Sequence, residues 1–201
     1  IPIFNEDTGA LGACLRSIEA QTYRPDLVVL VDDCSTDRTA SDMAEEWASL
    51  RDYAVYVALP KNVGKRHAQG VAFANYRADV WVTVDSDTVL EPDAVYQGLK
   101  PFNDPNVMAV TGTVLALNAI EGLLPRLIDV RYANAFLGDR AAQSTLGSVL
   151  CACGSLAFYR GDVVRENLND WLGQTFLGKP ATFGDDRRLT RYALDAGKVL
   201  L

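Results

Sequence analysis

Residues 80–87 read VWVTVDSD, and this stretch guides the interpretation of the rest of the chain. Its first five residues are all β-branched or aromatic, which is typical of a buried strand. Asp85 and Asp87 follow at the carboxyl end of that strand, where open α/β sheets bind ligands. Two carboxylates at such an edge are suited to a hard divalent cation. The alternative is an ordinary strand-to-loop boundary, where aspartate is common because it forms Asx turns.

A second acidic pair repeats this arrangement. Residues 26–31 read DLVVLV, a further apolar run, and they lead directly into Asp32 and Asp33. Because parallel strands end at the same edge of a sheet, we expect both pairs of acids to lie along one rim. Either pair alone is explained equally well by a turn, but together they favour a binding site.

Hydrophobic spacing predicts that strands and helices alternate through the first 117 residues. The expected strands are 27–31, 54–59, 80–84 and 107–117, and the expected helices begin after Thr8, after Ser35 or Thr36, at Gly64 and near Pro92. Such alternation is typical of an α/β fold with a mostly parallel, doubly wound central sheet flanked by helices. The 201 residues are expected to form a single domain.

The segment 119–142 departs from this alternation. It is dense in apolar residues and predicts a helix with more than one apolar face, which we interpret as a buried packing helix. A role at a membrane surface or against a partner helix stays open. Pro125 is expected to kink this helix or to divide it in two.

The composition argues against several classes of function. A net charge of −7 disfavours a nucleic-acid-binding protein that works through a basic face. The four cysteines lack the spacing of zinc ligands and His67 is the only histidine, so neither a disulfide framework nor a Cys/His metal site is expected. No apolar run is long enough to span a membrane. The opening residues IPIF resemble the end of a strand in progress, which indicates a piece of a longer protein.

Two further stretches carry charges at expected strand-to-helix junctions. Residues 61–66 place three cations around a glycine, and helix amides also favour anions, so we expect Lys65 or Arg66 to contact a phosphate. The alternative is a solvated basic turn. Residues 184–188 read GDDRR before a helical stretch, so Asp185 is either a helix cap or, in a cleft, a general base.

Taken in order, several motifs resemble those of family 2 glycosyltransferases. They are Pro2-Ile3-Phe4-Asn5-Glu6, Asp32-Asp33-Cys34-Ser35-Thr36-Asp37, Gly64-Lys65-Arg66, Asp85-Ser86-Asp87, the segment 151–155 and Gly184-Asp185-Asp186-Arg187. Residues 140–144 (RAAQS) and 174–180 (QTFLGKP) are most similar to the hyaluronan synthase branch, which has chitin synthases and nodulation-type chitooligosaccharide synthases as near relatives. The resemblance spans nearly the whole chain and implies a Rossmann-like GT-A catalytic domain.

This resemblance implies a site for a UDP-sugar donor. In the family, the backbone near Pro2 and the side chain that matches Asp33 hold the uracil. Glu6 matches a residue close to the nucleotide. Lys65 matches a lysine that faces the nucleotide and the diphosphate.

The resemblance also assigns the reaction chemistry. Asp85 and Asp87 match the pair that binds the ribose and a Mg²⁺ or Mn²⁺ ion, with Asp87 as the more direct ligand. Asp186, next to Asp185 in the catalytic motif, matches the general base that deprotonates the acceptor hydroxyl. A metal-bound diphosphate leaving group and a carboxylate base are the two parts that a single inverting displacement requires.

Four residues are assigned to the acceptor side. Gly154 and Ser155 match the segment beneath the acceptor sugar, Cys151 matches a cysteine near it, and Arg187 directly follows the base. Where the family often has Ser-Gly-Pro, this chain has Cys153-Gly154-Ser155, so the identity of the acceptor stays open.

The resulting hypothesis is a metal-dependent inverting transferase. It moves N-acetylglucosamine, glucuronic acid or both from a UDP-sugar to an oligosaccharide or a growing β-linked polysaccharide. Residues 1–117 form the nucleotide-sugar half, and residues 118–201 carry the acceptor site and the base. A chitin or chitooligosaccharide synthase is the alternative within the family. A non-catalytic nucleotide-sugar-binding module is the alternative outside it.

Two other observations concern an alternative enzyme class and the family motifs that are not found within the chain. A nucleotidyltransferase would need a glycine-rich triphosphate loop near the first strand, which residues 5–8 do not supply. The Gln-x-x-Arg-Trp motif and the channel-forming helices of the family are not found within the chain. The resemblance implies membrane association at the cytosolic face of the plasma membrane, through segments outside this sequence.

Overall fold

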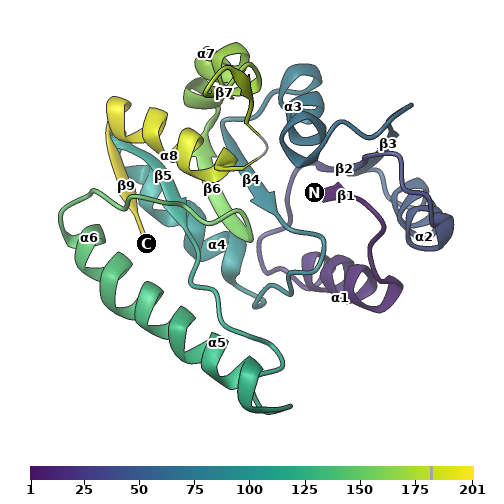
Figure 1. The fold of residues 1–201 in the computed structure, drawn as a ribbon, viewed down its shortest axis with the longest axis horizontal. Helices are drawn as coiled ribbons and strands as arrows, with labels where there is room; N and C mark the ends of the chain where they lie inside the picture. Colours follow the sequence, from purple (N-terminus) through teal and green to yellow (C-terminus); the bar gives the residue numbers. More distant parts are fainter. Residues whose placement is uncertain (182) are drawn as a thin grey trace.

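The computed structural model describes residues 1–181 and 183–201 and has the predicted α/β architecture (Figure 1). The elements follow in the order β1 (Pro2–Ile3), α1 (Thr8–Glu19), β2 (Val28–Asp32), α2 (Arg38–Ser49), β3 (Ala54–Ala58), α3 (Lys65–Asn75), β4 (Val80–Val84), α4 (Ala94–Leu99), η1 (Lys100–Asn103), β5 (Val107–Thr111), α5 (Leu123–Ala133), η2 (Asn134–Arg140), α6 (Ala141–Thr145), β6 (Leu156–Arg160), α7 (Gly161–Leu172), β7 (Thr175–Phe176), β8 (Lys179–Pro180), α8 (Asp185–Ala196) and β9 (Lys198–Leu200).

The strands form two main sheets and a small pair, β7 with β8. In the first sheet, in the order β1-β2-β3, neighbouring strands run parallel, and Pro2 lies opposite Val31. In the second sheet, in the order β4-β6-β5-β9, β6 runs antiparallel to β4 and β5, while β5 and β9 are parallel. Within the two main sheets, β6 is the antiparallel strand of an arrangement that was expected to be mostly parallel.

This reversal has a consequence for the candidate site. Leu156, the first residue of β6, lies opposite Val84 and Ala157 lies opposite Thr111, the last residues of β4 and β5. The segment 151–155 therefore arrives at the edge of the sheet where β4 and β5 end.

Local sequence explains where the helices begin. Asp7 caps α1 by accepting a hydrogen bond of 2.9 Å from the amide three residues later, so the cap lies one residue before the expected Thr8. Asp37 caps α2 in a similar way. Helices α3 and α8 instead begin after Gly64 and Gly184, whose φ angles of 86° and 83° favour glycine.

The buried side chains form a rigid base for the strand ends. Leu11 and Leu15 of α1 pack in one cluster with Leu30 of β2, and each is at most 2% exposed. Burial of a leucine side chain contributes about 1.5–3 kcal/mol. Tyr159 of β6 and Trp171 of α7 belong to a second cluster beneath α8. The loops at the rim are therefore anchored on well-packed elements.

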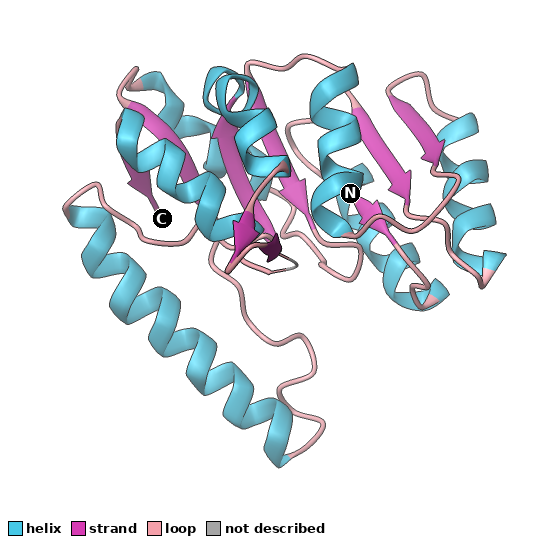
Figure 2. Ribbon diagram, turned by 45° about the horizontal axis from the view of Figure 1, so that its top comes forward, coloured by secondary structure: helices cyan, strands magenta, loops and turns pink. Residues whose placement is uncertain are grey.

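Residues 123–145 form a helical arm that projects away from the sheets (Figure 2). The prediction of a buried packing helix is wrong, because Leu123, Leu124 and Leu127 are 75%, 69% and 56% exposed. Pro125 lies in the first turn of α5, where proline is tolerated, so the predicted kink or division is not produced there. In the part of the chain that the structure describes, no helix is both long and apolar enough to cross a membrane.

Candidate active site

The loops after β1, β2 and β4 bring the first group of candidate residues to one rim. Glu6 follows β1, Asp33 follows β2 and Asp85 follows β4. Ser86 Oγ donates a hydrogen bond to Glu6 Oε2 at 2.5 Å, which ties the loop after β4 to the loop after β1. The single rim expected from the sequence is therefore formed, although β1 and β4 belong to different sheets.

Asp33 fixes the loop that leads into α3. Its carboxylate is buried and accepts one hydrogen bond on each oxygen, from Val63 N and Gly64 N, both at 2.7 Å. Hydrogen bonds to a charged acceptor are about twice as strong as neutral ones. Each oxygen also retains a second lone pair. Asp33 therefore positions the start of α3 and keeps capacity to accept a bond from a ligand.

The neighbouring Asp32 has a structural role. Its side chain is fully buried, and it accepts hydrogen bonds from Ser35 Oγ at 2.6 Å, Tyr56 Oη at 3.0 Å and Arg38 Nη1 at 3.2 Å. Both carboxylates of the acidic pair are therefore bonded inside the fold, Asp32 to three side chains and Asp33 to two backbone amides. The sequence pattern does not separate these two roles.

Lys65, the first residue of α3, lies between two groups of acids. Its Nζ donates to Asp85 Oδ1 at 2.5 Å. Burial lowers the pKa of Lys65, but Asp85, Asp186 and Asp185 outweigh burial and raise the pKa above its ordinary value. The lysine is therefore a charged ammonium between the acids after β4 and those that begin α8.

Asp186 is held against the backbone of Gly154. Gly154 N donates to Asp186 Oδ2 at 3.0 Å, and a Cβ at residue 154 would lie only 3.1 Å from Asp186 Oδ1. Burial, followed by the charge of Asp185, raises the pKa of Asp186, while the Gly154 amide and Lys65 act in the opposite direction. A carboxylate with a raised pKa is a stronger base when ionised.

Consecutive residues connect Asp186 to the acids after β4. Ser155, next to Gly154, places its Oγ at 3.5 Å from Asp85 Oδ2. The segment that arrives before β6 therefore contacts both the first aspartate of the DSD stretch and the second aspartate of the GDD stretch. The structure brings together Lys65, Asp85, Gly154, Ser155 and Asp186, which the sequence separates by up to 121 positions.

The segment 151–155 is held by three polar side chains that the sequence did not identify as supports. Thr111 Oγ1 accepts from Cys153 N at 2.9 Å, and Thr190 Oγ1 accepts from Ala152 N at 2.9 Å. Arg140 Nε donates to the Cys151 carbonyl at 3.0 Å. The RAAQS motif drew attention to residue 140, but the two threonines carry no local signal.

The other candidate residues lie at the margins of this cluster. Asp87 is exposed beyond β4, and Arg187 is exposed on the first turn of α8. Pro2 is half-buried in β1. Cys151 is half-buried, and burial followed by the charge of Asp186 raises the pKa of its thiol. Within the described residues, neither Asp87 nor Arg187 makes a side-chain hydrogen bond or ion pair.

Arg66 differs from the expectation that it could contact a phosphate. Its residue is 7% exposed, and its guanidinium donates to the carbonyls of Ala181 and Phe183 instead. Lys65 is the residue of this basic stretch that reaches the acids of the rim. Two adjacent cations therefore serve different parts of the fold.

The donor set at the rim fits a divalent cation shared with a substrate. Within the described residues, no group of three or more His, Cys, Asp or Glu side chains is arranged to hold a metal ion. Mg²⁺ is commonly bound by one or two carboxylates together with water and substrate phosphates. Asp85 and Asp87 supply two such carboxylates, and exposure leaves Asp87 accessible to an ion. The chemistry of the donors is therefore compatible with the expected Mg²⁺ or Mn²⁺.

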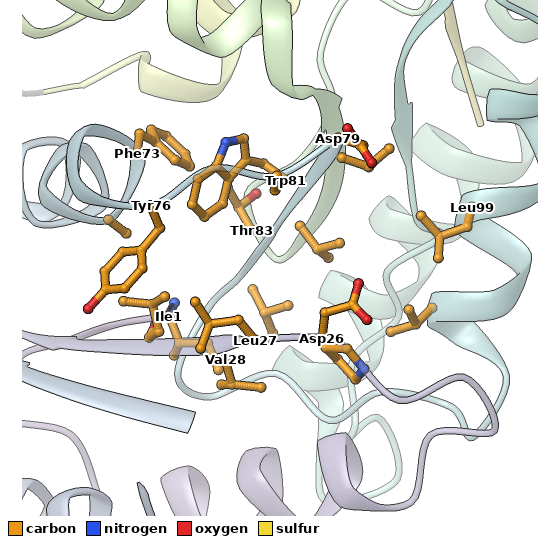
Figure 3. A pocket seen from close by; sticks show the side chains of 18 of the residues that line it. Ile1, Asp26, Leu27, Val28, Phe73, Tyr76, Asp79, Trp81, Thr83 and Leu99 are labelled. Atoms are coloured by element: carbon orange, nitrogen blue, oxygen red, sulfur yellow. Dashed lines mark hydrogen bonds between the residues drawn. The ribbon is translucent and has the colours of Figure 1, made fainter. Parts of the chain in front are cut away.

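A large cavity lies away from these residues, between the two main sheets (Figure 3). It measures about 930 Å³ and is lined by Ile1, Val28, Trp81 and Thr83 among others, while Pro2 is the only candidate site residue in its lining. The cavity contains none of the acids required for the chemistry considered above.

Solved structures with the same architecture define the class of the fold. A mannosyltransferase from Pyrobaculum calidifontis, in complex with GDP-Man and Mn²⁺, aligns with a TM-score of 0.74 and 23% identity over 99% of this chain and 52% of its own. S. aureus TarS 1–349, in complex with UDP, aligns with a TM-score of 0.62 and 19% identity over 100% of this chain and 56% of its own. The fold is that of GT-A glycosyltransferases, as the sequence predicted.

Sequence similarity assigns the chain to one family within this fold class. The profile of glycosyl transferase family 2 matches residues 1–168, and the chain belongs to that family. The chain is 45% identical to a hyaluronan synthase from Streptococcus pyogenes over its whole length. It is 42% identical to an N-acetylglucosaminyltransferase from Azorhizobium caulinodans over 98% of its length. It spans about half of these relatives, 49% and 50% respectively.

Proposed function

We propose that the chain is the catalytic part of a metal-dependent, inverting transferase that extends a β-linked polysaccharide from UDP-sugars. The similarity to a hyaluronan synthase supports this class of reaction. The observation that carries the proposal is the pair of contacts made by residues 154 and 155. Gly154 contacts Asp186, and Ser155 lies beside Asp85, so a candidate base and a donor-site acid flank one short segment.

In this proposal, the donor lies on the rim formed by residues 1–117. The backbone near Pro2 and the carboxylate of Asp33 contact the uracil, and Glu6 lies close to the nucleotide. Lys65 contacts the diphosphate, because its ammonium is charged and is already held at the rim by Asp85. An ammonium donates charge-assisted hydrogen bonds to phosphate oxygens.

Asp85 and Asp87 would hold the Mg²⁺ or Mn²⁺ ion. The bound ion supplies neutralisation of the negative charge that develops on the departing diphosphate. Asp87 is the more direct ligand, since Asp85 is already engaged by Lys65.

Asp186 acts as the general base for the acceptor. It accepts the proton of the acceptor hydroxyl, whose oxygen bonds to the anomeric carbon while the bond from that carbon to the UDP oxygen breaks. Attack and departure occur on opposite faces of the sugar, so its configuration inverts. The Gly154 amide fixes the orientation of the carboxylate, and burial together with Asp185 raises its pKa.

The acceptor lies on residues 118–201 in this proposal. The sugar chain rests over Gly154 and Ser155, close to Cys151 and Arg187. The transferred sugar is N-acetylglucosamine, glucuronic acid or both. The 42% identity to an N-acetylglucosaminyltransferase also favours a chitooligosaccharide product as the second candidate. The reaction takes place at the cytosolic face of the plasma membrane, with membrane segments supplied from outside residues 1–201.

The first experiment is a calorimetric titration of the chain with UDP, with and without Mn²⁺. Metal-dependent binding is expected in the native chain and is expected to be lost in Asp87→Asn. Asp139→Asn, which changes an exposed aspartate of the helical arm, is the matched control and should bind as the native chain does. Absence of UDP binding by a folded native chain both with and without Mn²⁺ would contradict the proposal for residues 1–201.

A further inference from the structure

Arg66 occupies an unusual position for an arginine next to a candidate phosphate-binding lysine. It is 93% buried, and within the described residues no carboxylate lies at ion-pair distance from it. Its Nη1 donates to the Ala181 carbonyl at 2.7 Å, and its Nη2 donates to the Phe183 carbonyl at 3.0 Å. A buried charge is costly, so its use for two backbone carbonyls indicates that this part of the chain must be fixed.

The two carbonyls belong to the loop that leads into α8. The side chain of Phe183 is 86% exposed, so packing of this ring does not anchor the loop. Gly184, which follows, adopts a φ of 83° and has open space around it. The backbone between Phe183 and Asp186 is therefore held mainly by hydrogen bonds rather than by buried side chains.

Trp171 of α7 provides the second attachment. Its Nε1 donates to the Asp185 carbonyl at 3.0 Å, and its ring lies beneath the guanidinium of Arg66, with 6.0 Å from the Arg66 Cζ to the ring centroid. The ring is fully buried. Arg66 and Trp171 thus fix the carbonyls of Ala181, Phe183 and Asp185, which precede Asp186.

We propose that Arg66 is a positioning residue that sets the place of Asp186 relative to Lys65. This inference rests on the proposed function, in which Lys65 faces the diphosphate and Asp186 is the base. Because Lys65 and Arg66 are consecutive residues in the first turn of α3, one rigid element determines both the donor contact and the entry to α8. The donor side and the base are therefore held in a constant relation through the buried arginine.

The test compares Arg66→Met and Arg66→Lys with a control, Arg77→Met. Arg77 is an exposed arginine just beyond the end of α3. UDP affinity in the presence of Mn²⁺ and amide hydrogen exchange are measured on the chain of 201 residues. Transfer is measured as kcat and KM for the donor in a full-length protein that carries these residues.

For Arg66→Met, UDP affinity is expected to stay within about twofold, since Lys65 and the acids of the rim are unchanged. The kcat is expected to fall roughly 10- to 100-fold, because a misplacement of about 1 Å can cost about 100-fold in rate. Exchange is expected to accelerate at the amides of residues 183–187, without a matching increase in β2. Arg66→Lys retains one donor group and should give a smaller loss of kcat.

Three results would overturn the inference. These are an unchanged kcat in both variants, unchanged exchange at residues 183–187, or a loss of UDP affinity as large as the loss of kcat, which would indicate a general structural role. If Arg66→Met does not fold, the same comparisons on Arg66→Lys decide the matter. Failure of the native chain to bind UDP would instead contradict the proposed function, while the exchange comparison would still test the loop.

Discussion

Replacement of Gly154 by alanine should slow sugar transfer without weakening donor binding. A Cβ at this position would lie 3.1 Å from Asp186 Oδ1 and 3.2 Å from Asp186 Oδ2, whereas ordinary contacts begin at 3.4 Å. The Asp186 carboxylate must therefore move away from residue 154 by about 0.3 Å, the difference between 3.4 Å and 3.1 Å. Gly154 is not among the glycines with a positive φ, so the added methyl group is the main perturbation.

The size of the effect follows from this displacement. If a misplacement of about 1 Å costs about 100-fold in rate, then about 0.3 Å costs about fourfold. Weakening of the bond from Gly154 N to Asp186 Oδ2, now 3.0 Å, adds up to about tenfold. We expect kcat to fall roughly 4- to 40-fold, which corresponds to about 0.8–2.2 kcal/mol of transition-state stabilisation.

The assay has two parts and a control variant. Initial rates of transfer, measured over a range of donor concentrations in a full-length protein, give kcat and KM. Calorimetry with UDP and Mn²⁺ gives the affinity of residues 1–201 for the nucleotide, which should change by less than about twofold. Gly138→Ala is the control, because a Cβ at that helical-arm position meets nothing within 4 Å.

Three outcomes would refute this reasoning. A native kcat in Gly154→Ala would show that the position of Asp186 does not limit the chemistry. A parallel fall in UDP affinity would show that residue 154 acts on the donor site instead. An equal loss in Gly138→Ala would point to a general effect of alanine substitution.

Two further predictions concern charge. Asp186→Asn should keep UDP binding but reduce transfer by about 10²- to 10⁴-fold, the usual contribution of a general base, and unchanged transfer would exclude that role. Burial and Asp185 raise the pKa of Asp186, so ionisation of this carboxyl at neutral pH disfavours the folded state. Asp186→Asn should therefore raise Tm at pH 7, and this gain should shrink as pH falls toward 4. The hydrogen bond from Lys198, followed by that from the Asn106 amide, lowers the pKa of Asp104 from 3.8 to about 2, so the stability from these contacts is present above pH 3.8 and is lost as pH falls through about 2. Asp104→Asn should therefore show a weaker fall of Tm between these pH values in scanning calorimetry, and identical acid profiles would show that the pair contributes nothing.

The sequence predicted those strands that are formed by nearly continuous runs of apolar residues. The strand over residues 80–84 lies at its predicted bounds, and the apolar run predicted as a strand over 27–31 forms one over 28–32, one residue later. No strand was predicted at β6, which directly follows the glycine-containing segment 151–155. Its antiparallel direction depends on how the chain returns to the sheet, which local periodicity does not encode.

The candidate site was predictable as a set of residues but not as an arrangement. Asp85 and Asp186 were identified from short motifs, yet their connection through Gly154 and Ser155 is a tertiary contact. Lys65 and Arg66 were equal candidates for a phosphate contact, because charge alone does not distinguish a side chain that faces a ligand from one that is buried against backbone carbonyls. The roles of these residues stay predictions until the variants above are measured.

The helical arm has a consequence for how the chain of residues 1–201 behaves in solution. It presents Leu123, Leu124, Leu127 and Leu137 to water, and exposed apolar patches of this kind promote association between molecules. The net charge of −7 opposes this attraction through mutual repulsion, which dissolved salt screens. Light scattering should therefore show that the chain remains dispersed at low ionic strength and self-associates as salt is added, so the choice of buffer governs its colloidal stability.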